Sequence, residues 1–188
     1  MSELDSQCLM AFPEWLQRLP ADSRAFADVL QQADAPRPVR AEAAAALNHL
    51  VKSLDLVPQS IEELGFIETA FVLRAAAARM LQDSADASDS TQSADRDTQT
   101  SDPASVFSAL AEEASLLEPF LGADFPRFTR YMGSLGELVV RGRSVPALLN
   151  DVDPRSELCD MVTSWAASYR APRFVSDAKS LVKIRAFL

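Results

Sequence analysis

Apolar side chains recur at steps of three and four residues along most of this chain, and the clearest run lies between Pro38 and Pro58. This spacing places the apolar side chains on one face of an α-helix. Pro38 suits the first turn of such a helix, where its missing N–H is not needed. Pro58 marks the end, because the residue before a proline is disfavoured in the α conformation. The pattern therefore predicts one helix between these two prolines.

A second helix is predicted directly after this turn. Ser60 and Glu63 have the spacing of a capping box, in which each side chain bonds to a backbone N–H group at the start of the helix. A stripe of apolar residues follows from Leu64 to Leu81. The two runs together predict a helical hairpin between residues 39 and 81.

Prolines divide the segment before this hairpin. We expect a short helix over residues 2–11, a restart of the chain at Phe12-Pro13 and an end at Pro20. A capped helix with inward apolar residues is predicted over residues 22–32.

The C-terminal part shows the same kind of pattern. Pro103 and Pro154 each follow an aspartate and suit the first turn of a helix. Short helices are predicted over residues 133–140 and 145–149, with a turn at residues 141–143 between them.

These elements predict an all-α fold, namely a two-lobed helical bundle of helical hairpins joined by a polar acidic linker. The lobes are residues 1–82 and 103–188, packed together or loosely tethered. The linker, residues 83–102, holds six aspartates, one arginine and no large apolar residue. Because such a segment cannot offset its ordering entropy by burial, we expect it to be disordered. A second interpretation is an acidic interaction tail or a phosphorylated switch.

Two short segments resemble each other on either side of the linker. Phe12-Pro13-Glu14-Trp15 and Phe125-Pro126-Arg127-Phe128 are each followed by a helix that starts with a proline. An internal duplication explains this order. Chance similarity between helical segments explains it as well.

The turn of the central hairpin carries a family resemblance. Asp55-Leu56-Val57-Pro58, then Ile61 and then Leu64-Gly65-Phe66-Ile67-Glu68, resemble the signature of the YkvA-like family of uncharacterised bacterial proteins. In that family a helix ends in an Asp-Leu-Ile-Pro-Asp turn, and a Gly-x-x-Asp-Asp element opens the next helix. The resemblance covers about Val39 to Ala77 and implies a helical fold for this region.

The chain departs from this signature at its acidic positions. Gln59 replaces the acid after the proline, and Glu68 and Thr69 stand where the family has paired aspartates. If the family acids bind a metal or take part in chemistry, this chain has lost that capacity. The family has no established biochemical role, so the resemblance implies a fold and little about function.

The net charge of −9 argues against a general nucleic-acid binder, because neutralising phosphates requires a basic surface. More than half of this charge lies in residues 83–102.

Several features indicate a cytoplasmic protein. Met1 to Asp5 contain neither the basic nor the apolar region of a signal peptide. Arg74 and Arg79 interrupt the best candidate for a membrane span. Cys8 and Cys159 lie far apart without a metal-binding spacing, so we favour two free thiols over a disulfide.

No motif of a known catalytic centre is present. The single histidine, His49, has no serine or cysteine motif to pair with, and we interpret it as an exposed or a hydrogen-bonded structural residue. Zinc binding by His49, Cys8 and Cys159 lacks the usual ligand spacing. Glycine-rich phosphate loops are absent, and no cofactor is expected.

Carboxylates do cluster around the turn of the hairpin. Glu62 and Glu63 suit the first turn of a helix, and Asp55 can cap the turn. The alternative is a divalent metal or small-ligand site, possibly hydrolytic in function, formed by Asp55, Glu62 and Glu68.

The last fifteen residues, Phe174 to Leu188, form an amphipathic and basic segment. We expect its apolar face to pack on the core, with contact to a membrane surface as the alternative. An aromatic-rich patch is likewise interpreted as core, with a partner-binding groove as the alternative; it comprises Phe120, Phe125, Phe128, Tyr131 and Met132.

The sequence therefore favours a non-enzymatic helical interaction or adaptor module that binds a protein partner or self-associates. It would bury apolar side chains in a groove between the lobes or against a partner helix. The first alternative is the Asp55 site, and the second is peripheral membrane association through the C-terminal helix.

Overall fold

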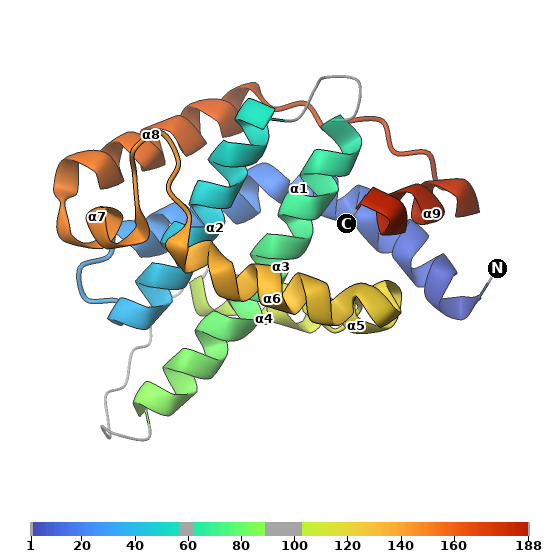
Figure 1. The fold of residues 1–188 in the computed structure, drawn as a ribbon, viewed down its shortest axis with the longest axis horizontal. Coiled ribbons are helices and arrows are strands. Elements are labelled where there is room, and N and C mark those ends of the chain that lie inside the picture. The colour runs from blue at the N-terminus through green and yellow to red at the C-terminus, as the bar shows by residue number, and fades with distance from the viewer. Residues whose placement is uncertain (1, 57–61, 89–102, 188) are drawn as a thin grey trace.

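The computed structural model describes residues 2–56, 62–88 and 103–187. These residues form an all-α bundle, as predicted, and contain no strand beyond a single bridge between Val140 and Arg143. In chain order (Figure 1) the helices are α1 (Glu3–Gln31), α2 (Arg37–Leu56), α3 (Glu62–Ser88), α4 (Pro103–Ala114), α5 (Leu117–Leu121), α6 (Phe125–Ser134), α7 (Val145–Asn150), α8 (Val152–Ser168) and α9 (Ala178–Phe187).

Helix α1 is one continuous helix, so the prediction of two helices broken at Phe12-Pro13 and Pro20 was wrong. Ser2 and Asp5 form a capping box at its start. A proline inside a helix costs about 3 kcal/mol, while full burial of one large apolar side chain contributes about 1.5–3 kcal/mol. Burial outweighs the cost here, because α1 buries a long row of such side chains: Phe12, Trp15, Leu16, Leu19, Phe26, Val29 and Leu30.

The central hairpin is present as predicted in its helical parts. Helix α2 begins at Arg37 with Pro38 in its first turn and ends at Leu56, two residues before Pro58. Its row of alanines, Ala43 to Ala46, is buried, which lets neighbouring helices approach closely. The turn and the capping serine lie outside the described residues.

Helix α3 continues to Ser88, six residues into the segment that was expected to be a linker. The Ser84 hydroxyl donates to the Met80 carbonyl at 2.8 Å and lies in this extension. The rest of the expected linker lies outside the described residues. Helix α4 begins at Pro103, as predicted.

The segments before and after residue 100 share one hydrophobic core. Helix α3 packs along α4, and α1 packs along α8. At the centre, the ring of Phe12 lies 5.1 Å from that of Phe71 and 4.9 Å from that of Phe120, which comes from the C-terminal segment. Tyr169 of that segment also donates to the Leu16 carbonyl at 2.9 Å. The two expected lobes are therefore parts of one bundle in this structure.

A tight turn follows α6. The predicted helix over residues 133–140 is reduced to a 3-10 turn, Leu135–Glu137. The expected turn is present, with Arg141 and Gly142 at φ angles of 50° and 77°. The buried amide of Asn48 donates to the carbonyls of Leu138 and Arg143 at 3.4 and 3.3 Å, which holds this turn against α2.

Helix α9 lies on the core as expected, with Leu181 and Ile184 buried. The Arg185 side chain donates to Asp5 at 3.2 Å and to the Phe120 carbonyl at 3.1 Å. In the described part of the chain, no helix has the length and apolar character needed to cross a membrane.

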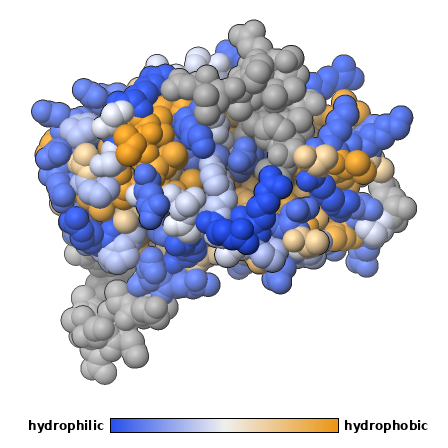
Figure 2. Space-filling view, in the orientation of Figure 1, coloured by the Kyte–Doolittle hydropathy of each residue, from blue (hydrophilic) through white to orange (hydrophobic). Residues whose placement is uncertain are grey.

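Hydrophobic side chains reach the surface shown in Figure 2 in separate patches among hydrophilic ones. Single exposed residues of this kind are normal for a folded protein. Among the residues whose side chains are described, the exposed large apolar ones are Met10, Val139, Val152, Val175 and Val182.

Candidate binding groove

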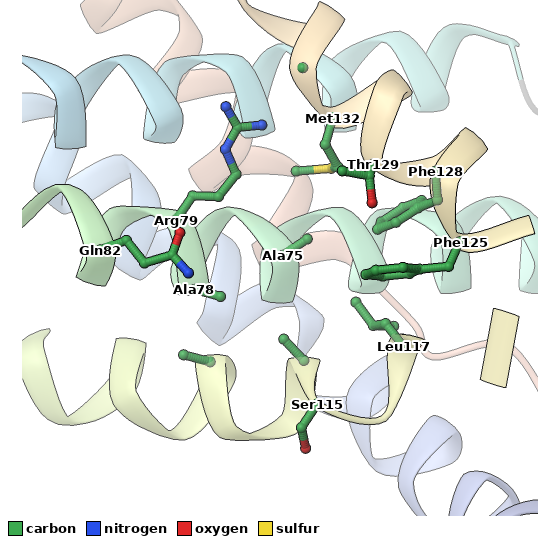
Figure 3. A pocket seen from close by; sticks show the side chains of 13 residues that line it. Ala75, Ala78, Arg79, Gln82, Ser115, Leu117, Phe125, Phe128, Thr129 and Met132 are labelled. Atoms are coloured by element: carbon green, nitrogen blue, oxygen red, sulfur yellow. The ribbon is translucent and has the colours of Figure 1, made fainter. Parts of the chain in front are cut away.

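A cavity of about 610 Å³, partly open to solvent, lies between α3, α4 and α6. Helix α3 comes from the N-terminal segment, and the other two come from the C-terminal segment (Figure 3). We call this cavity the α3–α4–α6 groove. It is lined by Ala75, Ala78, Arg79, Gln82, Ala111, Ala114, Ser115, Leu117, Phe125, Phe128, Thr129, Met132 and Gly133.

Small side chains form the floor of the groove. Ala75 and Ala78 face it from α3, and Ala111 and Ala114 face it from α4. Alanines let two helices approach closely and leave space above their contact. The same residues that hold α3 against α4 therefore keep the groove empty.

The two ends of the groove differ in character. Phe125, Phe128 and Leu117 gather at one end, while Arg79 and Gln82 lie at the other (Figure 3). Aromatic rings supply large apolar contact areas. The groove therefore offers an apolar end and an end with hydrogen-bonding groups.

Arg79 is already paired where it lines the groove. Its guanidinium lies 3.0 Å from the Glu42 carboxylate of α2. Burial raises the pKa of Glu42, Arg79 lowers it, and the nearby Asp83 raises it again. Among the described residues that line the groove, Arg79 is the charged one, and its partner Glu42 lies on α2 outside the lining.

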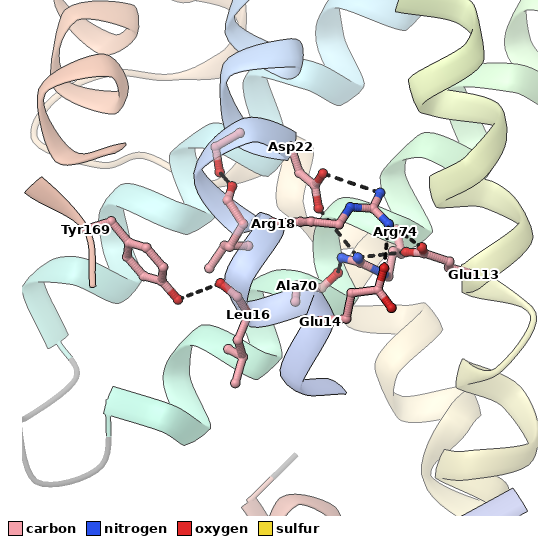
Figure 4. Close-up of polar contacts among 10 residues, drawn as sticks. Glu14, Leu16, Arg18, Asp22, Ala70, Arg74, Glu113 and Tyr169 are labelled. Carbon is pink, nitrogen blue, oxygen red and sulfur yellow. Dashed lines mark hydrogen bonds and ion pairs between the residues drawn. The ribbon is translucent and has the colours of Figure 1, made fainter. Parts of the chain in front are cut away.

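A buried charge network fixes α4, which forms one side of the groove. Arg74 of α3 is fully buried and lies 2.7 Å from Glu113 of α4 and 3.4 Å from Asp22 of α1 (Figure 4). Its guanidinium also stacks 4.1 Å from the centre of the Trp15 ring. Arg18 of α1 reaches the same glutamate at 2.7 Å.

The network is structural in character. Burial raises the pKa of Asp22, although Arg74 and Arg18 both lower it. Buried charges need partners of this kind, because removing one partner leaves another charge unpaired in a medium of low polarity. The arrangement joins α1, α3 and α4, and its charged side chains form ion pairs with one another.

His49 is buried and hydrogen-bonded, which confirms the structural alternative over an exposed side chain. Its Nδ1 lies 2.7 Å from the Tyr131 hydroxyl of α6, and its Nε2 lies 3.3 Å from the Ser53 hydroxyl. Burial and, as a smaller contribution, the charge of Lys52 together lower the pKa of His49 to about 3. The imidazole is therefore neutral at pH 7 and ties α2 to α6.

The carboxylates proposed to bind a metal are only partly described. The side chains of Asp55 and Glu62 lie outside the described part of the chain. Burial raises the pKa of Glu68, and Lys52 counteracts this. Among the described side chains, no group of three or more His, Cys, Asp or Glu residues could hold a metal ion. A metal site at the Asp55 turn stays a prediction.

Both cysteines are buried and free, as favoured from the sequence. Burial raises the pKa of Cys8 to about 11. A thiol in this state is a weak nucleophile, because the thiolate is the reactive form. Cys8 and Cys159 therefore serve as small apolar core residues.

Sequence reasoning found part of the groove. The aromatic patch was expected, and within it Phe120, Phe128 and Met132 are buried while Phe125 is half-buried. The alanine floor and Arg79 were missed as groove residues. The available signal was the alanine run at residues 75–78 and the pair Ala111 and Ala114, three positions apart on one helix face.

A scan against protein-family models, a search of curated proteins and a search of solved structures find no match to this chain. The resemblance to the YkvA-like family therefore stays a prediction from the residues around Asp55.

Proposed function

We propose that this protein is a non-enzymatic helical interaction module that binds apolar side chains of a partner helix in the α3–α4–α6 groove. The observation that carries the proposal is the groove itself, with its floor of alanines and its aromatic end. The proposal keeps the cytoplasmic location and the bacterial type expected from the sequence.

The dimensions of the groove support this proposal. Its volume of about 610 Å³ falls within the roughly 300–1,000 Å³ typical of ligand pockets. An amphipathic helix binds such a groove by inserting apolar residues spaced three and four positions apart. A floor of alanines between walls of larger side chains provides room for them.

The neighbouring charged groups favour binding over proton transfer. Arg79 is paired with Glu42, and Arg74 is paired with Glu113. A general acid or base has to reach a substrate with its own proton site. These groups instead hold helices in place around an apolar space.

The test fills the groove with a larger side chain and measures the loss of dye binding. Nile red, a neutral apolar dye, serves as the probe, and its fluorescence rises in an apolar site. We expect saturable binding at one site in the wild type and at least a tenfold loss in Ala78→Phe, whose ring occupies the groove.

Ala167→Phe is the matched control, because it adds the same ring at an exposed alanine on α8. This variant is expected to bind the dye like the wild type. Circular dichroism is expected to show that both variants are folded. No saturable binding to the wild type, or equal binding to both variants, contradicts the proposal. A second test on Ala111→Phe of α4 covers the case in which Ala78→Phe does not fold.

A further inference from the structure

We propose that three arginines, gathered where the start of α2 meets α7 and α8, bind the phosphate group of a small phosphorylated ligand. They are Arg37 and Arg40 of α2 and Arg155 of α8, and α7 packs against both of these helices. None of the described residues that line the α3–α4–α6 groove belongs to α2, α7 or α8. The arginine site is therefore separate from the proposed helix-binding groove, and either proposal can fail without the other.

Hydrogen bonds to neutral oxygen atoms hold the three side chains at this junction. Both terminal nitrogens of Arg37 donate to the side-chain oxygen of Asn150, each at 3.2 Å. Arg155 donates to the backbone carbonyls of the two residues that precede Asn150, at 3.5 and 3.3 Å. Arg40 lies one turn after Arg37 on α2, and its Nε donates to the Leu30 carbonyl at 3.3 Å. The end of α7 thus brings arginines of α2 and α8 together.

The positive charges of these arginines are not balanced locally. In the part of the chain that the structure describes, no carboxylate forms an ion pair with any of the three, although the net charge of the chain is −9. Burial and the neighbouring charges of Arg155 and Arg37 lower the pKa of the Arg40 guanidinium. A bound anion would relieve this repulsion, because an opposite charge stabilises the charged form of each group.

The start of α2 adds to the positive potential. Its first turn contains no acidic residue, and Arg37 and Arg40 lie in it. The N-terminus of a helix carries a partial positive charge, which favours anions and disfavours cations. The two arginines therefore add to an electrostatic cost that a bound anion would offset.

The chemistry of the guanidinium group favours phosphate as the anion. Each guanidinium has five N–H donors in a planar fork that matches phosphate oxygens, and the bonds described above leave donors available on all three. Arginines from two helices suit a tetrahedral group with several oxygens. The carboxylates of Asp34, Asp151 and Asp153 are exposed and close in sequence to these arginines. Because they would repel an extended anionic surface such as a membrane, the complementary ligand is a small molecule.

The experiment titrates the full chain with inorganic phosphate at constant ionic strength and follows the amide signals by NMR. We expect saturable shifts at one site, confined to the start of α2, to α7 and to the start of α8. Arg37→Gln removes one charged group that donates to the anion, so its affinity is expected to fall by about tenfold or more. Arg40→Gln repeats the test in case Arg37→Gln does not fold.

Arg127→Gln is the matched control, because Arg127 is exposed on α6 and its substitution removes the same charge. This variant is expected to bind phosphate like the wild type. Glycerol 3-phosphate, a small phosphate monoester, is expected to cause the same shifts as inorganic phosphate. Vesicles that contain phosphatidic acid present the same group on a membrane, and they are expected not to sediment the protein.

Several results would overturn the inference. One is the absence of saturable shifts in the wild type, and another is a set of shifts that lies elsewhere in the fold. Unchanged affinity in both Arg37→Gln and Arg40→Gln, or an equal loss in Arg127→Gln, would mean that these arginines do not form a specific site. Vesicle binding that Arg37→Gln abolishes would assign the site to a membrane surface and overturn the small ligand.

Discussion

The buried guanidinium of Arg74 makes this residue unusually sensitive to substitution. It has no exposed surface and contacts Asp22, Glu113 and the ring of Trp15. Arg74→Met keeps the volume but leaves Asp22 and Glu113 with Arg18 in place of two cationic partners. We expect the free energy of unfolding to fall by about 3–5 kcal/mol, as measured by urea denaturation.

Arg24→Ala provides the comparison, because this arginine is exposed on α1. Its substitution is expected to change the free energy of unfolding by less than about 0.5 kcal/mol. Similar losses in Arg74→Met and Arg24→Ala would mean that the buried network does not hold α3 and α4 as described.

His49 gives the protein a specific pH dependence. Its pKa is lowered from 6.5 to about 3 in the folded state by burial. The unfolded chain therefore takes up the proton first, and the free energy of unfolding falls as the pH drops from about 6.5 towards 3. Each pH unit in this range removes up to about 1.4 kcal/mol.

His49→Gln removes this titration and leaves all other groups in place. Urea denaturation at pH 7, 6, 5 and 4 is expected to show the wild type losing stability relative to the variant. Since the chain has one histidine, its imidazole NMR signal can be followed directly. A midpoint near 6.5 in the folded protein would contradict burial of the ring.

At the scale of elements, sequence reasoning succeeded where a local pattern agreed with the packing. Pro38 and Pro103 begin helices and Pro58 follows the end of one. The breaks predicted at Pro13 and Pro20 were wrong, because burial of α1 side chains against helices distant in the sequence outweighs the cost of a proline inside a helix. The pattern within residues 2–31 does not contain that information.

The end of α3 could not be predicted for a related reason. Residues 83–88 contain alanine, serine and aspartate but no large apolar residue. Once a helix has formed, each added residue costs little, because the unfavourable step is nucleation. The helix therefore continues past Leu81, where its apolar stripe ends.

The repeated motif has different structures in its two copies. Phe12-Pro13 lies in the interior of α1, whereas Phe125-Pro126 opens α6. The shared residue types therefore occur in two different structural contexts, the interior of one helix and the first turn of another.

Helix α9 is predicted to contribute to stability through its buried face. Ile184 is 1% exposed, so Ile184→Ala is expected to lower the free energy of unfolding by about 2–5 kcal/mol. Val182 on the same helix is 62% exposed, and Val182→Ala is expected to have an effect below about 0.5 kcal/mol. Equal effects in urea denaturation would mean that α9 does not pack on the core and would favour its use at a membrane surface.

At the scale of the whole molecule, the shared core predicts one cooperative unfolding transition. The chain has two tryptophans, Trp15 in α1 and Trp165 in α8. Trp165→Phe leaves fluorescence from the first, and Trp15→Phe leaves it from the second. In each variant, we expect the fluorescence midpoint in urea to match that of circular dichroism. Separate midpoints would show two independently folding lobes.

The groove is also a property of the whole molecule, because it forms where α3 of the N-terminal segment meets α4 and α6 of the C-terminal segment. Apart from its polar end at Arg79 and Gln82, most of its residues are small or apolar and look like ordinary core positions in the sequence. The space between them follows from the relative placement of three helices, which no local pattern encodes.

The most direct test of this binding site is methyl NMR on the five methionines of the chain, with assignments made by single Met→Leu substitutions. Met132 lines the groove, whereas Met10 and Met161 do not. On titration with Nile red, we predict a saturable shift of the Met132 signal while those of Met10 and Met161 stay in place. Binding that shifts Met10 or Met161 and leaves Met132 unchanged would contradict the groove as the binding site.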